Sequence, residues 1–169
     1  MKWTGGWKPA WSKTFLSNAK AESVMEKPTF KRYIGNRCLI PADGFYEWMH
    51  DSTPIRFTKP NDETFCFAGL FYETKDQTLD MEVAHEHVIL LTTTPNKSVG
   101  RVHNRMPFIV QPSHYDWWLS DGGMFETVLT VPDRDELNWC PVQKELNKVN
   151  NEGPELIRPS IVQKNLFGT

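Results

Sequence analysis

Short apolar runs, separated by proline, glycine and charged residues, recur along most of this chain of 169 residues. Their β-branched and aromatic content predicts strands at residues 37–41, 44–49, 54–58, 64–72, 86–94 and 107–110. Helix-like spacing predicts helices at residues 112–120 and 133–138, and Val142 is expected to open a last short strand. The pattern therefore indicates an α+β fold in which strands dominate.

One segment leaves two local structures open. Residues 21–33 have helical character but contain Pro28, so they can form one helix or two short turns. Proline suits the first turn of a helix, where an N–H has no partner within the helix. No repeat, low-complexity tract or linker divides the sequence, so we expect a single domain over residues 1–169.

The segment RCLIPADGFYEW, at residues 37–48, reads as strand, turn and strand. Alternation along the second strand places Phe45 and Glu47 on one face. Tyr46 and Trp48 then take the other face. A carboxylate beside an aromatic ring loses solvation, which raises its pKa and suits Glu47 to proton transfer near neutral pH. A half-exposed glutamate without a chemical role is the alternative.

His103 follows the strand predicted at residues 86–94, on a loop that opens with proline. Loops after strands often carry chemistry, and the pKa of imidazole suits proton transfer at physiological pH. The alternative is a structural histidine that is hydrogen-bonded to the backbone. Arg105, two residues further on, can hold a phosphate or pair with an acid.

The segment LSNAKAES, at residues 16–23, offers an amide and a cation. The Asn18 amide can bond a carbonyl or a ring-opened sugar, and the Lys20 ammonium can meet a phosphate. From the residues alone, an ordinary turn or helix-capping asparagine is the more common interpretation.

Charge is spread unevenly along the sequence, whose net charge is −2. Residues 1–59 hold ten Lys/Arg against five Asp/Glu, and the remainder holds nine against sixteen. The candidates for a phosphate track in this basic part are Lys13, Lys20, Lys27, Lys31, Arg32 and Arg37. The candidates for base stacking are Trp3, Trp7, Trp11 and Trp48. This combination favours single-stranded over duplex nucleic acid. A solvated basic face above buried tryptophans is the alternative.

Three cysteines, with no signal peptide and no membrane-length apolar run, predict a soluble protein of the reducing cytoplasm. CxxC and HExxH spacings are missing from the sequence, so no metal or other cofactor is predicted. His85 and His87 alternate on a predicted strand and can share a metal, but zinc usually needs a third ligand, and the sequence shows none nearby.

Several of these segments resemble signatures of the SRAP family, the SOS response-associated peptidases that act on abasic sites in single-stranded DNA. Residues 37–48 match its RCLIPADGFYEW signature and residues 103–107 its HNRMP motif. Residues 16–23 resemble its INARAET segment, with Lys20 in place of an arginine that can bind in bidentate fashion. Weaker similarity, to a WG-x-x-P-x-W segment and to a C-terminal ELI stretch, extends the resemblance over nearly the whole chain.

The resemblance implies a β-barrel-like core of mixed and antiparallel sheet with peripheral short helices. It implies catalytic roles for Asn18, Glu47 and His103, and DNA contacts by Lys20, Arg105, Trp11, Trp48 and Thr92. The expected partner is single-stranded DNA with abasic sites, bound without a cofactor. The expected protein is a monomer, encoded by a bacterium or phage, cytoplasmic and associated with the nucleoid when on DNA.

Family members carry a cysteine directly after the initiator methionine, in an MCGR start. Its amine and thiol react together with the aldehyde of the abasic site to give a thiazolidine crosslink. This chain begins MKWT, so we expect that segment to be missing through a misplaced gene start, natural shortening or supply by another polypeptide. Cys38, Cys66 and Cys140 are internal and lack the free amine.

Two functional classes therefore stay open. As an enzyme, the protein would sense abasic DNA in the SOS damage response, crosslink to it, cleave the strand by β-elimination and remove its own leading residues. As a binding module, it would hold single-stranded DNA noncovalently. An inactive remnant is the weaker third possibility.

Overall fold

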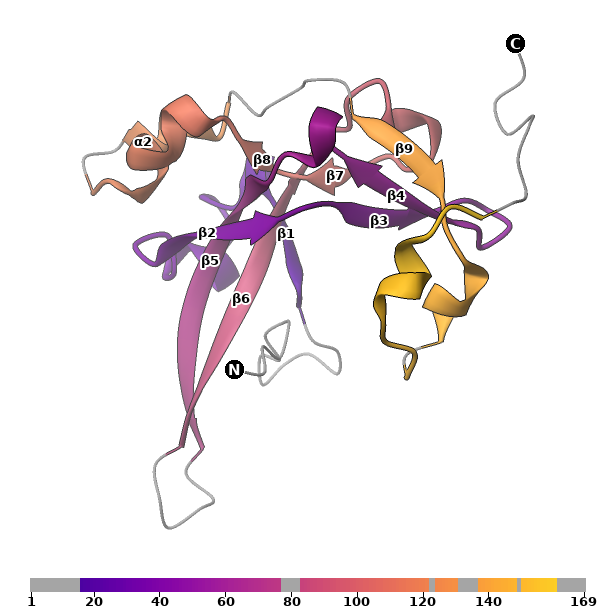
Figure 1. Cartoon of the computed structure of the whole chain (residues 1–169). Helices are drawn as coiled ribbons and strands as arrows, with labels where there is room; N and C mark the ends of the chain where they lie inside the picture. Colours follow the sequence, from indigo (N-terminus) through magenta and orange to yellow (C-terminus); the bar gives the residue numbers. More distant parts are fainter. Residues whose placement is uncertain (1–15, 77–82, 122–123, 131–136, 149, 161–169) are drawn as a thin grey trace. The chain divides into compact units, whose positions relative to one another are not determined.

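The computed structural model describes residues 16–76, 83–121, 124–130, 137–148 and 150–160 (Figure 1). The chain divides into two compact units. The first unit comprises Met1–Pro41, Phe65–Thr93 and Pro107–Asp133, and the second comprises Ala42–Thr64, Thr94–Met106 and Arg134–Thr169. That the units form one domain stays a prediction from the sequence.

The first unit is built on a mixed sheet with the strand order β1-β6-β5-β2. These strands are β1 (Asn18–Lys20), β2 (Arg37–Ala42), β5 (Phe65–Asp76) and β6 (Val83–Thr93). The strands β5 and β6 form the long antiparallel hairpin in Figure 1, whereas β1 runs parallel to β6. Two short strands, β7 (Met106–Pro107) and β8 (Ile109–Val110), pair with β6 and β5 respectively.

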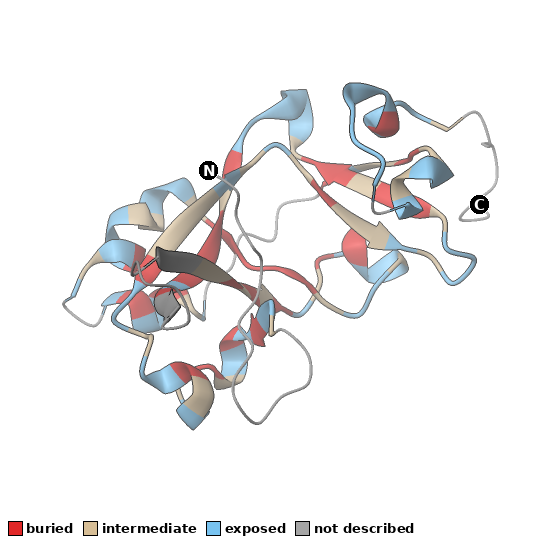
Figure 2. Ribbon diagram, turned by 90° about the horizontal axis from the view of Figure 1, so that it is seen from below, coloured by how far each residue is buried: buried red, intermediate tan, exposed pale blue. Residues whose placement is uncertain are grey.

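Short helices and turns cover this sheet. The described ones in the first unit are η1 (Ala21–Ser23), α1 (Pro28–Lys31), η4 (Pro112–His114), α2 (Tyr115–Leu119) and α3 (Met124–Val128). They bury Phe30, Trp118 and Phe125 against Leu70, Ile89 and Leu91 of the sheet, and buried residues are red in Figure 2. Gly69 lets β2 approach β5, because a Cβ there would lie 2.7 Å from the Ile40 side chain.

Arg37 joins α2 to β2 from inside the first unit. Its Nε donates to the Trp118 carbonyl at 2.7 Å, and one terminal nitrogen donates to the Ser120 carbonyl at 2.6 Å. The other terminal nitrogen donates to the Ile34 carbonyl, and the guanidinium lies 4.1 Å from the Phe125 ring centroid. Since Arg37 is buried and turned inward, its expected place in a phosphate track is wrong.

The second unit holds an antiparallel sheet with the order β3-β4-β9. Its strands are β3 (Phe45–Trp48), β4 (Pro54–Thr58) and β9 (Asn138–Pro141), and its turns are η2 (Pro60–Asp62), η3 (Val99–Arg101), η5 (Lys144–Asn147) and η6 (Pro154–Ile157). Phe45 and Phe57 stack within its core, with ring centroids 5.2 Å apart. Ile55, Leu137 and Val142 are buried in the same unit.

The predicted α+β class is confirmed, with mixed and antiparallel sheets and short helices. Residues 21–33 form two short turns, with Pro28 in the first turn of α1. The strand predicted at residues 107–110 is divided, because Phe108 donates to Leu91 of β6 and accepts from Ala68 of β5.

The last predicted elements need correction. The helix expected at residues 133–138 falls mostly outside the described residues, and Asn138 instead begins β9. Val142 opens no strand but forms an isolated bridge with Pro159. Proline at the end of β9 hid this strand, since proline usually weakens a strand prediction.

Within the part of the chain that the structure describes, no helix is long and apolar enough to cross a membrane. Nor do the described side chains include a group of three or more metal-ligating residues. His87 stacks on Tyr72, with ring centroids 4.8 Å apart, and the side chain of His85 lies outside the described set.

Candidate functional site

Glu47 occupies the third position of β3, opposite Ile55 of β4. Its side chain is 20% exposed. Burial raises the pKa of its carboxyl, and the charge of His103 opposes this shift less strongly. The raised pKa expected from the strand pattern is therefore found, and the carboxyl holds its proton to higher pH than an exposed glutamate.

The loop after β6 holds His103 in place through backbone bonds. The Asn96 side chain is buried, and its Oδ1 accepts the Val99 N–H at 2.9 Å. This bond starts the turn η3, and the His103 N–H then donates to the Val99 carbonyl at 2.9 Å. Thus Asn96 fixes the path of the chain into His103, as a capping residue does at the start of a helix.

Glu47 and His103 meet in the second unit, where Glu47 Oε2 lies 3.6 Å from His103 Nδ1. The same nitrogen lies 3.0 Å from the Arg105 carbonyl oxygen and 3.2 Å from the Arg105 backbone nitrogen. A protonated Nδ1 can donate to the Arg105 carbonyl, and an unprotonated one can accept from the Arg105 N–H, while Glu47 contacts the imidazole only as a charged neighbour. The backbone can thus support both protonation states of an imidazole that is 44% exposed.

Asn18, Lys20 and Thr92 come together in the first unit. In β1, Asn18 and Lys20 are exposed on either side of buried Ala19. Lys20 lies opposite Thr92 in the parallel register, and Thr92 Oγ1 donates to the Ala19 carbonyl at 3.3 Å. Asn18 is therefore a strand residue and not a capping or turn residue.

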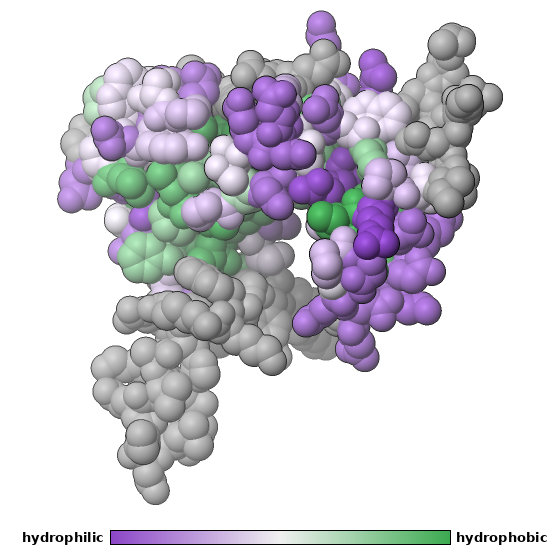
Figure 3. Space-filling view, in the orientation of Figure 1, coloured by the Kyte–Doolittle hydropathy of each residue, from purple (hydrophilic) through white to green (hydrophobic). Residues whose placement is uncertain are grey.

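Trp48 ends β3 and is 45% exposed. Its Nε1 donates to Asn147 Oδ1 of η5 at 2.7 Å. Much of the described surface around η5 is hydrophilic in Figure 3. Strand alternation places the Trp48 ring on the face of β3 opposite Glu47.

Other predicted residues are placed less fully. Trp11 lies outside the described residues, and Arg105 is half-buried with interactions of its own. The sequence pattern did not reveal Asn96 or Asn147 as supporting residues. The only signal for Asn147 was its place in a stretch rich in lysine and asparagine.

Two of the described thiols, those of Cys38 and Cys140, are poorly suited to attack. Burial raises the pKa of the Cys38 thiol to about 11. Burial also raises the pKa of the Cys140 thiol, and the Arg56 guanidinium opposes this shift less strongly. Both residues therefore stay protonated and weakly nucleophilic near neutral pH.

Known proteins resemble this chain in sequence and in fold. The model of the family described as SOS response associated peptidase (SRAP) matches residues 1–149. The abasic site processing protein YoqW of Bacillus subtilis (strain 168) is 32% identical over 163 residues, which cover 88% of this chain and 71% of YoqW. The abasic site processing protein YedK of Escherichia coli (strain K12) is 23% identical over 167 residues, covering 91% of this chain and 70% of YedK.

A crystal structure of a protein from Bacteroides thetaiotaomicron has the same fold. It superposes with a TM-score of 0.77 at 23% identity and covers 94% of this chain and 76% of that one.

Proposed function

Because this chain belongs to the SOS response associated peptidase family, we propose that it recognises and processes abasic sites in single-stranded DNA. The contact between Glu47 and His103 carries the proposal, since it joins a half-buried carboxyl of raised pKa to an exposed imidazole. The names of the relatives YoqW and YedK, both abasic site processing proteins, support the substrate class.

Glu47 and His103 suit the proton transfers that open the sugar of an abasic site. In its closed form, the sugar is a hemiacetal. Opening it removes the proton of the anomeric hydroxyl while the ring C–O bond breaks and the ring oxygen gains a proton. A carboxyl that keeps its proton can supply the second proton, and a neutral imidazole can remove the first. The product is the aldehyde on which further processing acts.

The remaining roles follow the family motifs. We assign Asn18 to orientation of the opened sugar and Thr92 to support of β1, because Thr92 Oγ1 already bonds the Ala19 carbonyl. Lys20 and Arg105 are assigned to phosphates, and Trp11 and Trp48 to unpaired bases. The family's crosslink to DNA and its autopeptidase step, in an SOS damage response, are the finer form of this proposal.

A noncovalent role in holding single-stranded DNA is the second candidate. The observation that favours it is the pKa of about 11 for the Cys38 thiol. At pH 7 such a thiol is ionised in roughly one molecule in ten thousand, so covalent attack by Cys38 would be slow.

A denaturing gel separates the two candidates. The chain is incubated with a single-stranded oligonucleotide that carries one abasic site, beside an undamaged oligonucleotide and an abasic duplex. A damage-dependent covalent band or a cleaved strand supports processing. Intact DNA that is nevertheless retained in a native gel supports the noncovalent candidate. Absence of both results for the damaged single strand contradicts the proposal.

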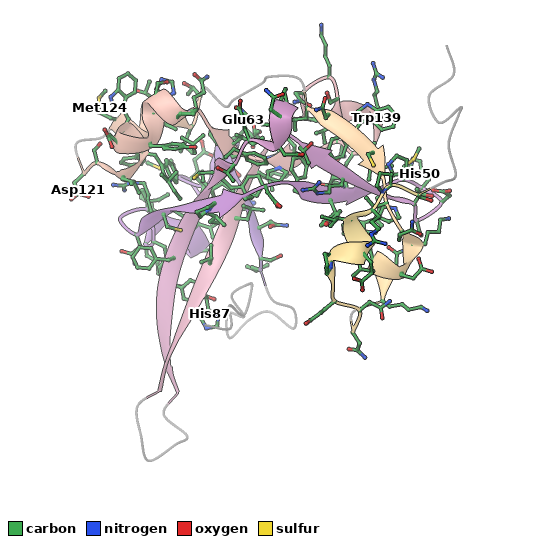
Figure 4. All side chains as sticks on the ribbon, in the orientation of Figure 1. His50, Glu63, His87, Asp121, Met124 and Trp139 are labelled. Carbon is green, nitrogen blue, oxygen red and sulfur yellow. The ribbon has the colours of Figure 1, made fainter. Side chains whose placement is uncertain are left out.

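Matched variants identify the acid and base. We expect Glu47→Gln and His103→Ala to lower the rate of processing by about 10²-fold or more, in line with the usual contribution of a general acid or base. Glu63→Gln and His50→Ala are the controls, because both residues are exposed in the same unit and are labelled in Figure 4. Equal rates for Glu47→Gln and Glu63→Gln would remove Glu47 from the chemistry.

A further inference from the structure

Side-chain contacts join the turn between β3 and β4 to η5 in the second unit. Asn147 Nδ2 donates to the Ser52 carbonyl at 2.9 Å, while Asn147 Oδ1 accepts the Trp48 indole N–H at 2.7 Å. Lys144 Nζ lies 3.8 Å from Asp51 Oδ2. A single amide thus connects the backbone of the turn to the edge of the exposed tryptophan.

The turn between β3 and β4 and the segment of η5 are each held by hydrogen bonds of their own. On the turn, the Asp51 carboxylate accepts the Thr53 N–H at 3.0 Å and the Thr53 hydroxyl at 2.8 Å. The Met49 N–H donates to the Thr53 carbonyl, and the Ser52 N–H donates to the Met49 carbonyl. The turn's own bonds therefore fix the Ser52 carbonyl, independently of the bond that it accepts from Asn147.

The segment that carries Asn147 is also closed by its own bonds. The Lys148 N–H donates to the Glu145 carbonyl at 3.1 Å, and Asn151 Nδ2 donates to the same carbonyl at 2.9 Å. The Leu146 N–H donates to the Gln143 carbonyl at 3.1 Å. Asn147 accordingly holds its amide between a fixed turn and the Trp48 indole.

The bond to Asn147 restrains Trp48 while leaving ring surface exposed. Without this bond, an indole that is 45% exposed could populate several staggered rotamers. Bonding occurs at the ring edge, through Nε1, so it does not compete with stacking on the face. An aromatic ring fixed before binding loses less conformational entropy when it stacks on a ligand.

We infer that Asn147 is a positioning residue that holds the Trp48 indole in a fixed plane for stacking against an unpaired base of single-stranded DNA. The inference rests on the proposed function and adds the residue that positions the Trp48 ring. Asn147 itself touches no base in this scheme. Its effect on DNA binding should therefore depend on the indole N–H of Trp48.

Binding of a fluorescein-labelled, undamaged single-stranded thymidine oligonucleotide, followed by anisotropy, tests this dependence. We expect Asn147→Ala to weaken binding about fivefold, the effect of losing one net hydrogen bond, and Trp48→Ala by at least as much. Asn150→Ala is the matched control, because Asn150 is an exposed asparagine of the same unit and is not one of the residues that hold Asn147 in place. This control should leave the Kd unchanged.

A double-mutant cycle with Trp48→Phe distinguishes positioning from a structural role. Phenylalanine keeps an aromatic face but cannot donate to Asn147, so Asn147→Ala should have no further effect on Kd in that background. A fivefold loss that persists in the Trp48→Phe background would overturn the inference. ¹⁵N-labelled tryptophan gives a direct readout, because the indole N–H signal that disappears in Trp48→Phe should exchange faster with solvent in Asn147→Ala.

The outcomes also separate this inference from the proposed function. If the unmodified chain binds the oligonucleotide and Asn147→Ala binds equally well, the inference fails and the proposed function stands. If the unmodified chain binds no single-stranded DNA, both fail. The gel assay with abasic DNA reads the Glu47 and His103 chemistry separately.

Discussion

Loss of the Arg37 guanidinium should destabilise the first unit more than loss of any exposed arginine. In Arg37→Met, three backbone carbonyls lose a charged donor, those of Ile34, Trp118 and Ser120. Hydrogen bonds to charged groups contribute about 1.5–3 kcal/mol each, but only the bond to Trp118 is fully buried, and water can replace part of the others. The expected cost is therefore about 3–5 kcal/mol.

Other contacts and substitutions of Arg37 should change the stability by smaller amounts. The ion pair of Arg37 with Asp121, 3.3 Å long, adds little because the Asp121 carboxylate is fully exposed. Arg37→Lys keeps the charge, but a compact ammonium cannot span three separate carbonyls, so about half of the loss should remain. Arg158→Met serves as the control, because Arg158 is exposed and lies in the second unit.

Urea denaturation followed by tryptophan fluorescence measures these differences. A small domain is typically stable by only about 5–15 kcal/mol, so Arg37→Met should shift the midpoint strongly or leave the first unit partly unfolded. A loss below about 1 kcal/mol, equal to that of Arg158→Met, would refute the argument from the buried guanidinium. Where folded, Arg37→Lys should bind single-stranded DNA with unchanged Kd, because the guanidinium points inward.

Three further predictions follow from local geometry. The pKa of Glu47 is raised in the folded state, so the stability that this residue contributes is present at low pH and is lost as pH rises above about 4.5. Urea titrations from pH 4 to 8 should therefore show Glu47→Gln gaining stability relative to the unmodified chain as the pH rises. Asn96→Ala removes the side-chain bond to the Val99 N–H at the start of η3 and should cost about 1–2 kcal/mol in thermal melts. It should also slow processing, because His103 is displaced, and unchanged rates would argue against this positioning. Gly69→Ala should lower the free energy of unfolding by about 1–3 kcal/mol in urea denaturation, because the added Cβ would lie 2.7 Å from the Ile40 side chain. An unchanged free energy of unfolding would mean that Ile40 moves freely.

Apolar, β-branched and aromatic content together with turn chemistry predicted most of the strands. In β3, the alternation of residue types also indicated a shielded Glu47 carboxyl. The three-residue strand β1 could not be predicted in the same way. Its structure depends on parallel pairing with β6, about 70 residues later in the chain, and not on a local pattern.

Supporting residues were harder to find than reacting ones. Glu47 and His103 belong to types that attract attention as acid and base, and both lie in recognisable motifs. Asn96, Asn147 and Arg37 act on backbone carbonyls, N–H groups or an indole edge. Such partners have no sequence signature, because every residue carries the same carbonyl. The motif arginine Arg37 was misread for this reason, as its charge suggested phosphate while its position required burial.

The two faces of β3 separate the proposed chemistry from the proposed stacking. Glu47 faces His103, whereas alternation sends Trp48 to the other face, where Asn147 restrains it. In the part of the chain that the structure describes, the contacts of Glu47 and His103 with each other and with Arg105 involve neither Asn147 nor the turn at Ser52. Variants at Asn147 should therefore change DNA affinity without changing the rate from bound DNA, and variants at Glu47 should do the reverse. This independence allows binding and processing to be assigned to different residues of a single four-residue strand.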